Sequence, residues 1–172
     1  MKRFTDSIRL AVQAKNWYGA LTGALSLPDV CGKLESPDVG SQQRYSAWFE
    51  RWVQPKYTHQ LGGRLGQQHI FLSGRDCYAL RCSYLHEGGG QIEHQRAREA
   101  LVSFHFITPP GNGSVIHMNQ FNNTLQLQVD IFSNDIASAA DQWSESVAGN
   151  EPIQARIKEL IVIHDGANGV RF

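Results

Sequence analysis

The spacing of apolar residues predicts a helix at the start of the chain. Apolar side chains recur three or four positions apart through residues 1–27, which is the spacing of one helix face. We expect this helix to bend near Asn16 or Gly19 and to end or change direction at Pro28, because proline lacks the backbone N–H that a helix interior needs.

A second helix is predicted to begin at Ser41, whose hydroxyl can cap it, and to end before Pro55. Its aromatic residues share one face, as expected of a helix that packs against a core. The following stretch, 54–68, is polar and holds the glycine-rich segment 62–66, which lacks the Gly-Lys-Ser/Thr ending of a phosphate-binding loop. We therefore expect a long connection here.

Residues 73–87 form the best-marked helix of the sequence. Ser73 is followed three residues later by Asp76, a pattern similar to a capping box. Three glycines starting at Gly88 then favour the end of the helix, since glycine readily adopts the conformation found there.

After residue 100 the period of the pattern changes from helical to two. Two alternating segments and an apolar one between them predict a three-stranded antiparallel meander at about 101–131. A helix capped by Ser133 or Asn134 and a short helix starting near Pro152 follow. The fold class expected is mainly α, a helical bundle in a single domain 1–172 with a β insertion before its last core helix.

Composition limits the class of protein. The chain has 172 residues, 41% of them apolar, which is enough for one hydrophobic core that needs no disulfides or metal ions to stabilise it. No apolar run approaches the roughly 20 residues of a membrane span, and the N-terminus lacks the hydrophobic stretch of a signal peptide. Three cysteines form no even disulfide framework, so free thiols are expected. These features favour a soluble, cytoplasmic protein.

The formal charge is zero, which argues against a generic polyanion binder. The charge is unevenly distributed, however. Residues 41–98 hold eight basic side chains, seven of them Arg, against four acidic ones, whereas the chain from 99 onward is acidic. Because Arg makes planar, two-pronged contacts with phosphate, an anionic ligand is expected in this middle segment. The alternative is that these arginines lie on solvated helix faces.

Cysteines and histidines in the same region raise two other hypotheses. Cys77, Cys82, His86 and His94 are of the types that bind zinc, yet Cys77 and Cys82 would point about 140° apart on one helix, so a metal site is not expected. Cys82, next to Arg81 and one turn before His86, has neighbours that a nucleophile needs. A small apolar side chain in a helix core is the commoner use of such a cysteine. We expect no cofactor.

Arg81 and His86 suit phosphoryl chemistry on RNA. His86 falls in the last turn of the predicted helix, where backbone carbonyls favour a protonated imidazole, and Arg81 offers a permanent charge for a phosphate. The two would point about 140° apart on an ideal helix. Fraying of the helix at Gly88 could re-aim His86, and a symmetric dimer that packs this helix against its copy would gather both types of group in one cleft. The structural alternative pairs the Arg with a carboxylate such as Asp76 or Glu50.

The pair also matches the Arg-x(4–6)-His signature of the HEPN superfamily, a helical-bundle family rich in metal-independent ribonucleases, toxins and abortive-infection proteins. Three segments together resemble small bacterial members of that superfamily: Leu27–Glu35, Arg44-Tyr45-x-x-Trp48-Phe49 and Leu72–Gly88. The residue after the Arg is Cys82, where the family often has Asn, Asp or His.

The resemblance implies an endoribonuclease in which Arg81 and His86 are catalytic and the homodimer forms through their helix. Arg75 is then the expected substrate-binding side chain, with Asp76 and Tyr84 in support; Asp76 is more typical of a helix cap than of a catalytic partner. RNA is the expected substrate, and an antitoxin protein a further partner. A non-catalytic HEPN-like module that binds a nucleotide, RNA or protein is the second hypothesis, and an adaptor that recruits a partner strand to the meander edge is the third.

Overall fold

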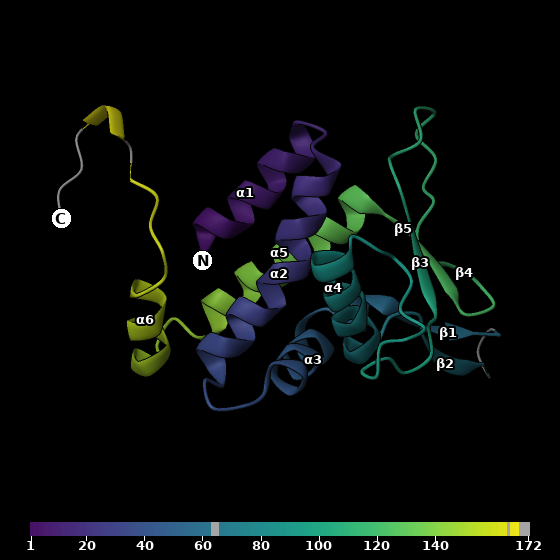
Figure 1. The fold of residues 1–172 in the computed structure, drawn as a ribbon, viewed down its shortest axis with the longest axis horizontal. Helices are drawn as coiled ribbons and strands as arrows, with labels where there is room; N and C mark the ends of the chain where they lie inside the picture. The colour runs from purple at the N-terminus through teal and green to yellow at the C-terminus, as the bar shows by residue number, and fades with distance from the viewer. Residues whose placement is uncertain (63–65, 165, 169–172) are drawn as a thin grey trace.

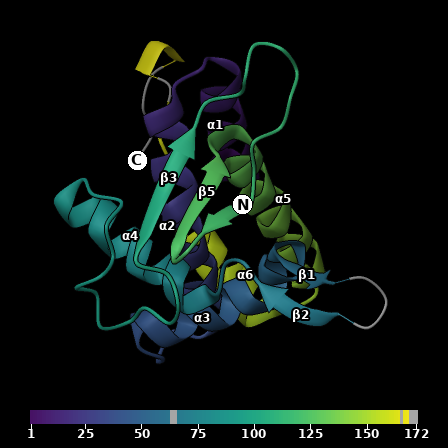
Figure 2. The same ribbon diagram turned by 90° about the vertical axis from the view of Figure 1, so that its right-hand side faces the viewer.

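The computed structural model describes residues 1–62, 66–164 and 166–168. The central part of the glycine-rich segment predicted as a loop, residues 63–65, lies outside them. The fold is mixed α and β and mainly helical (Figure 1). The small sheets lie at one end of the helical part, and α6 and the C-terminal segment lie at the other (Figures 1 and 2).

The predicted first helix is two helices, α1 (Lys2–Gln13) and α2 (Trp17–Glu35). The chain breaks between them because Lys15 adopts a positive φ of 55°, and the side chain of Asn16 then caps α2 by accepting from the N–H of Gly19. The prediction that Pro28 ends the helix was wrong: α2 continues through it for seven more residues. Because α2 packs against α1, α3 and α5, burial of its apolar face outweighs the missing hydrogen bond.

The second and third predicted helices are confirmed. Helix α3 (Ser41–Trp52) begins after Gly40 rather than at a Ser41 cap, and the short 3-10 helix η1 (Gln54–Tyr57) follows it. Helix α4 (Gly74–Glu87) is capped by Ser73, whose hydroxyl accepts from the N–H of Asp76 at 3.1 Å, and it ends at Gly88 with a φ of 69°. The local capping pattern in the sequence therefore located α4 correctly.

The connection between α3 and α4 contains a hairpin that the sequence pattern did not predict. Strands β1 (Thr58–Leu61) and β2 (Gln67–Ile70) pair antiparallel, with Thr58 opposite Ile70. Their side chains are mostly polar and exposed, so the alternation that marks a half-buried strand is missing from this stretch.

The predicted antiparallel meander was also wrong in its topology. Strands β3 (Ser103–Ile107), β4 (Asn119–Phe121) and β5 (Thr124–Gln128) form a sheet in the order β3-β5-β4, in which β3 and β5 are parallel. Only β4 and β5 form the expected hairpin, around a turn in which Asn122 has a φ of 51°. The segment between β3 and β4 turns the chain back, so that β4 runs antiparallel to β5 and β5 parallel to β3. The two-residue period of the sequence does not reveal this return.

The long helix α5 (Val129–Ser146) starts directly after β5, four residues before the predicted Ser133 cap. Its first apolar residues continued the two-residue period of the strand, which is why the boundary was misplaced. Helix α6 (Glu151–Lys158) and the 3-10 helix η3 (Gly166–Asn168) complete the chain. Among the described residues, no helix is both long and apolar enough to cross a membrane.

The buried apolar side chains belong to one cluster drawn from the helices and the larger sheet. Its largest fully buried members are aromatic: Trp48, Trp143, Tyr45, Tyr57, Phe49 and Phe132. Most of them lie on α3 and α5, or on η1 between α3 and the hairpin. The aromatic face predicted for the second helix therefore lies in the core.

His117 links the arm before β4 to the start of α5. Its Nδ1 accepts from the N–H of Gln128 at 3.1 Å, and its ring lies edge-on to Tyr57 with 5.6 Å between centroids. Burial lowers the pKa of His117, although the carboxylates of Asp135 and Asp130 oppose the shift. The folded protein therefore favours a neutral His117.

This preference predicts a pH dependence of stability. As the pH falls below about 6.5, the unfolded chain binds a proton at His117 before the folded chain does, so the free energy of unfolding decreases, by at most ~1.4 kcal/mol per pH unit. His117→Gln keeps an acceptor for Gln128 and should remove this part of the decrease. Urea unfolding on both sides of that pH measures it, with the exposed His105→Gln as control. An unchanged pH dependence in His117→Gln would contradict the assignment.

Candidate functional site

Arg81 lies on the side of α4 that faces α2. One of its terminal nitrogens, Nη2, is 3.3 Å from Oδ2 of Asp29 on α2, and the side chain is 21% exposed. The other, Nη1, is 4.0 Å from the sulfur of Cys82, and the buried Nε has no hydrogen-bond partner among the described residues. Arg81 therefore has an ion pair while most of its donors are left without an oxygen partner.

Asp29 is shared with a second arginine. Arg44 on α3 donates from Nε at 3.0 Å and from Nη2 at 2.9 Å to Oδ1 of Asp29, and from Nη1 to the carbonyl of Val39. The three side chains form what we call the Asp29 cluster: Asp29, Arg44 and Arg81. It joins α2, α3 and α4, and it joins the three sequence segments that carry the HEPN resemblance. Two guanidinium groups share one carboxylate there, so one formal positive charge is left over.

The sequence did not identify Asp29 as the partner of Arg81. Asp76 and Glu50 were the carboxylates considered, and the structure pairs neither of them with Arg81 among the described residues. Asp29 is 52 positions away in the sequence, so helical spacing carries no signal for this contact. The only available clue is that Asp29 lies in one of the segments with family resemblance.

His86 lies in the last turn of α4, as predicted, and its side chain is exposed. No described residue makes a hydrogen bond with its ring. Within one chain the structure therefore does not bring His86 and Arg81 together: Arg81 contacts α2, whereas His86 faces solvent.

The supporting residue Tyr84 attaches α4 to α2. Its hydroxyl donates to the carbonyl of Tyr18 and shares a second bond with the hydroxyl of Thr22, both at 3.4 Å. These bonds hold α4 against α2. Tyr84 itself lies on the side of α4 that faces α2.

Asp76 is an internal anchor. It is 2% exposed, and its carboxylate accepts from the N–H groups of Glu99 at 2.7 Å, Ala100 at 3.2 Å and Leu101 at 3.4 Å, and from the hydroxyl of Ser73. The acceptor sites of this carboxylate are thus used to hold the segment before β3 against the first turn of α4.

The thiols are not arranged as a catalytic or metal site. Burial raises the pKa of Cys77 to about 12, and burial also raises the pKa of Cys31, so both favour the unreactive neutral form. Cys82 is half-buried and free. Among the residues that the structure describes, no three His, Cys, Asp or Glu side chains are close enough together to hold a metal ion.

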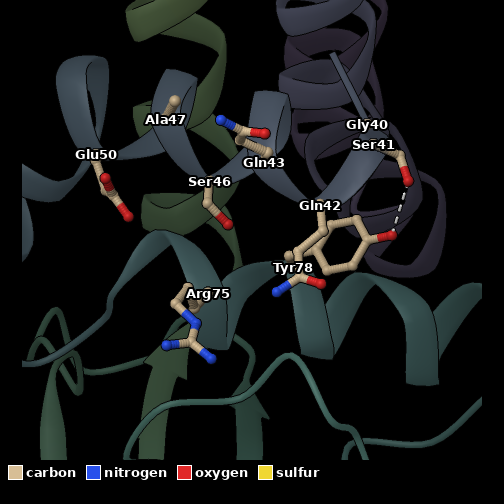
Figure 3. A pocket seen from close by; sticks show the side chains of 9 residues that line it. All are labelled: Gly40, Ser41, Gln42, Gln43, Ser46, Ala47, Glu50, Arg75 and Tyr78. Carbon is tan, nitrogen blue, oxygen red and sulfur yellow. Dashed lines mark hydrogen bonds between the residues drawn. The ribbon is translucent and has the colours of Figure 1, made fainter.

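Arg75, the predicted substrate-binding residue, lines a hollow on the surface that α3 and α4 form. This hollow, which we call the α3–α4 groove, has a volume of about 600 Å³ and lies between the outward faces of α3 and α4 (Figure 3). Its lining comprises Gly40, Ser41, Gln42, Gln43, Ser46, Ala47, Glu50, Arg75 and Tyr78. Arg75 donates through Nε to the carbonyl of Ala97, and its two terminal nitrogens have no hydrogen-bond partner among the described residues.

Comparisons with protein-family models, with curated proteins and with solved structures found no match to this chain. The resemblance to the HEPN superfamily therefore stays a prediction from the sequence.

The anchoring role of Asp76 predicts a structural phenotype. Asp76→Asn keeps the size of the side chain but places donors against backbone N–H groups, so we expect the free energy of unfolding to fall by about 2 kcal/mol. Urea denaturation measures the change, with the exposed Asp38→Asn as the matched control. A variant as stable as the wild type, yet deficient in activity, would instead place Asp76 in the functional chemistry.

The Asp29 cluster predicts unequal roles for its two arginines. Arg44→Met removes two contacts to Asp29 and should lower the free energy of unfolding by about 2 kcal/mol, whereas Arg81→Met removes one longer contact and should cost about 1 kcal/mol. Arg51→Met is the control, because Arg51 also lies on α3 and pairs with Glu35 but is 61% exposed. Equal losses in Arg44→Met and Arg51→Met, measured by urea unfolding, would contradict this ranking.

Proposed function

We propose that this protein is a metal-independent endoribonuclease of HEPN type, with a role as a toxin or phage-defence component. The observation that carries the proposal is the charge of the Asp29 cluster. Two guanidinium groups share one carboxylate, and Arg81 is the less tightly held of the two. A partly buried arginine with free donors is suited to a phosphate oxygen, because a guanidinium cannot lose its charge.

In the proposed reaction the ribose 2′-hydroxyl attacks the adjacent phosphorus. The 2′-oxygen loses its proton to a basic group, a bond from the 2′-oxygen to phosphorus forms, and the bond to the 5′-oxygen breaks as that oxygen gains a proton. The products are a 2′,3′-cyclic phosphate and a free 5′-hydroxyl. His86 carries the proton, and Arg81 stabilises the charge that develops on the phosphate oxygens.

A homodimer completes the proposed site. His86 and Arg81 point about 140° apart around α4, so the His of one chain and the Arg of its partner are expected to meet across the contact between two α4 helices. The C-terminal half of α4 is available for this contact: His86 is exposed, and Cys82 is half-buried. An antitoxin protein that covers this face would suppress activity.

A second function, a non-catalytic module that binds RNA or a nucleotide, is favoured by one observation. His86 has no described hydrogen-bond partner that would orient its ring, whereas a catalytic base is commonly positioned by a third group. Under this alternative the same basic surface binds RNA without turnover.

The test is cleavage of RNA in EDTA by the wild type, Arg81→Ala and His86→Ala. We expect both substitutions to lower the cleavage rate at least ~100-fold, because each removes a group that acts in the transition state. His94→Ala is the control, since His94 is also an exposed histidine. Circular dichroism and urea unfolding confirm that the variants fold.

Cleavage that survives either substitution would contradict the proposed roles. Loss of wild-type cleavage in EDTA would contradict a metal-independent reaction. Salt-sensitive RNA binding without any cleavage would favour the non-catalytic module instead.

A further inference from the structure

The α3–α4 groove lies beside a point at which its two helices approach each other closely. A Cβ on Gly74, the first residue of α4, would lie 2.5 Å from the carbonyl oxygen of Ser46 on α3, so only glycine allows this approach. The helices leave open space on their outward side, and Figure 3 shows side chains from both pointing into it. A volume of about 600 Å³ lies within the range of small-molecule sites.

One buried polar group at the floor of the groove has no partner. The residue Ser46 is 6% exposed, and its hydroxyl makes no hydrogen bond with any described residue. Figure 3 shows this hydroxyl directed toward the space between α3 and α4. Because a buried hydroxyl without a partner is costly, the groove has an unmet requirement for a polar ligand.

The two charged residues of the groove are also unpaired. Arg75 on α4 and Glu50 on α3 both line the groove, yet neither has an ion-pair partner among the described residues. A guanidinium donates hydrogen bonds and a carboxylate accepts them. A groove lined by both therefore suits a ligand that has acceptors and donors next to each other.

The opposite end of the groove is the N-terminus of α3. Helix α3 has 12 residues, no side chain caps it, and its first turn holds no acidic residue. The groove is lined there by Gly40, Ser41 and Gln42, whose helix-terminal N–H groups attract anions. Ser46 lies about 6 Å further along the helix axis than Gln42, and Glu50 about 6 Å beyond that. The groove thus has a helix N-terminus that attracts anions at one end and the hydroxyl of Ser46 in the middle. The charged side chains of Arg75 and Glu50 lie at the other end.

We propose that the α3–α4 groove binds a guanine nucleotide of single-stranded RNA. The phosphate lies at the N-terminus of α3, and a ribose hydroxyl bonds to Ser46. Arg75 donates to O6 and N7 of the base, as arginine does when it reads guanine, and the carboxylate of Glu50 accepts from N1–H and the N2 amino group. Tyr78 and Ala47 form the walls, and Tyr78 is fixed by a bond to Ser41.

The arrangement discriminates against adenine. Adenine places an amino group where guanine has O6, so two sets of donors would meet at Arg75, and its N1 lone pair would face Glu50. The edge of guanine runs from N7 through O6 and N1 to N2, so it offers acceptors to Arg75 and donors to Glu50, both of which line the groove.

This inference rests on the proposed interaction with RNA, whether or not the RNA is cleaved, and it names the base that is recognised. Two residues of the groove, Arg75 and Tyr78, lie on α4, the helix that also carries Arg81 and His86. A guanine held there fixes the position of the RNA relative to that helix.

The test is the binding of 5′-GMP, 5′-AMP, 5′-CMP and 5′-UMP to the full chain, measured by isothermal titration calorimetry. We expect 5′-GMP to bind at least about tenfold more tightly than 5′-AMP. Glu50→Gln should weaken 5′-GMP binding about tenfold and leave 5′-AMP binding unchanged, so that the preference is lost. Arg75→Gln should also weaken 5′-GMP binding about tenfold.

Two controls match these variants. Arg3→Gln changes an exposed arginine on α1 that, like Arg75, makes a hydrogen bond to a backbone carbonyl, and Glu145→Gln changes an exposed glutamate on α5. Both should bind 5′-GMP as the wild type does. Equal affinity for the four nucleotides, no measurable binding, or 5′-GMP binding that is unaffected in both Glu50→Gln and Arg75→Gln would overturn the inference.

The outcome is separable from that of the cleavage assay. Guanine-selective binding with these variant effects, in a protein that cleaves no RNA, supports the groove and contradicts the catalytic proposal alone. Cleavage that depends on Arg81 and His86, in a protein that does not select guanine, contradicts the groove alone.

Discussion

The carboxylate of Asp29 is the interaction on which the arrangement of the functional helices depends. It accepts from Arg44 on α3 and from Arg81 on α4, so one side chain of α2 fixes two helices at once. The cluster is largely but not completely buried, which makes its hydrogen bonds stronger than those of a surface pair while part of each guanidinium still meets solvent. A shift of either helix would change the width of the groove between them.

The two arginines of the cluster differ in how many of their donor groups have an oxygen partner. All three nitrogens of Arg44 contact an oxygen, whereas Arg81 has one oxygen partner, Asp29, and a contact of 4.0 Å with the sulfur of Cys82. Arg75, two turns before Arg81 on α4, lines the groove, and its two terminal nitrogens have no hydrogen-bond partner among the described residues. In a chain with no net charge, positive charge is therefore concentrated locally where α2, α3 and α4 meet.

The sequence predicted helix ends correctly where neighbouring residues set them. It failed where contacts between residues far apart in the chain determine the structure. Ser73 and Gly88 located α4 because capping acts within a few positions. Pro28 was misjudged because the packing of α2 against three helices outweighs one lost hydrogen bond. The parallel pairing of β3 with β5 and the contact between Asp29 and Arg81 join residues far apart in the chain, which periodicity does not encode. The sequence named Arg81 as a candidate residue, but it did not identify Asp29 as its partner.

The central claim is that RNA is held on the surface formed by α3 and α4. Hydrogen–deuterium exchange with a guanine-containing, 2′-O-methylated RNA, which lacks the attacking hydroxyl, tests it most directly, with an all-adenine RNA for comparison. The account predicts slower exchange at the first turn of α3 and along α4, with the guanine-containing RNA giving the larger effect. Protection confined to other elements, such as the β1–β2 hairpin, or equal protection by both RNAs along α3, would contradict it.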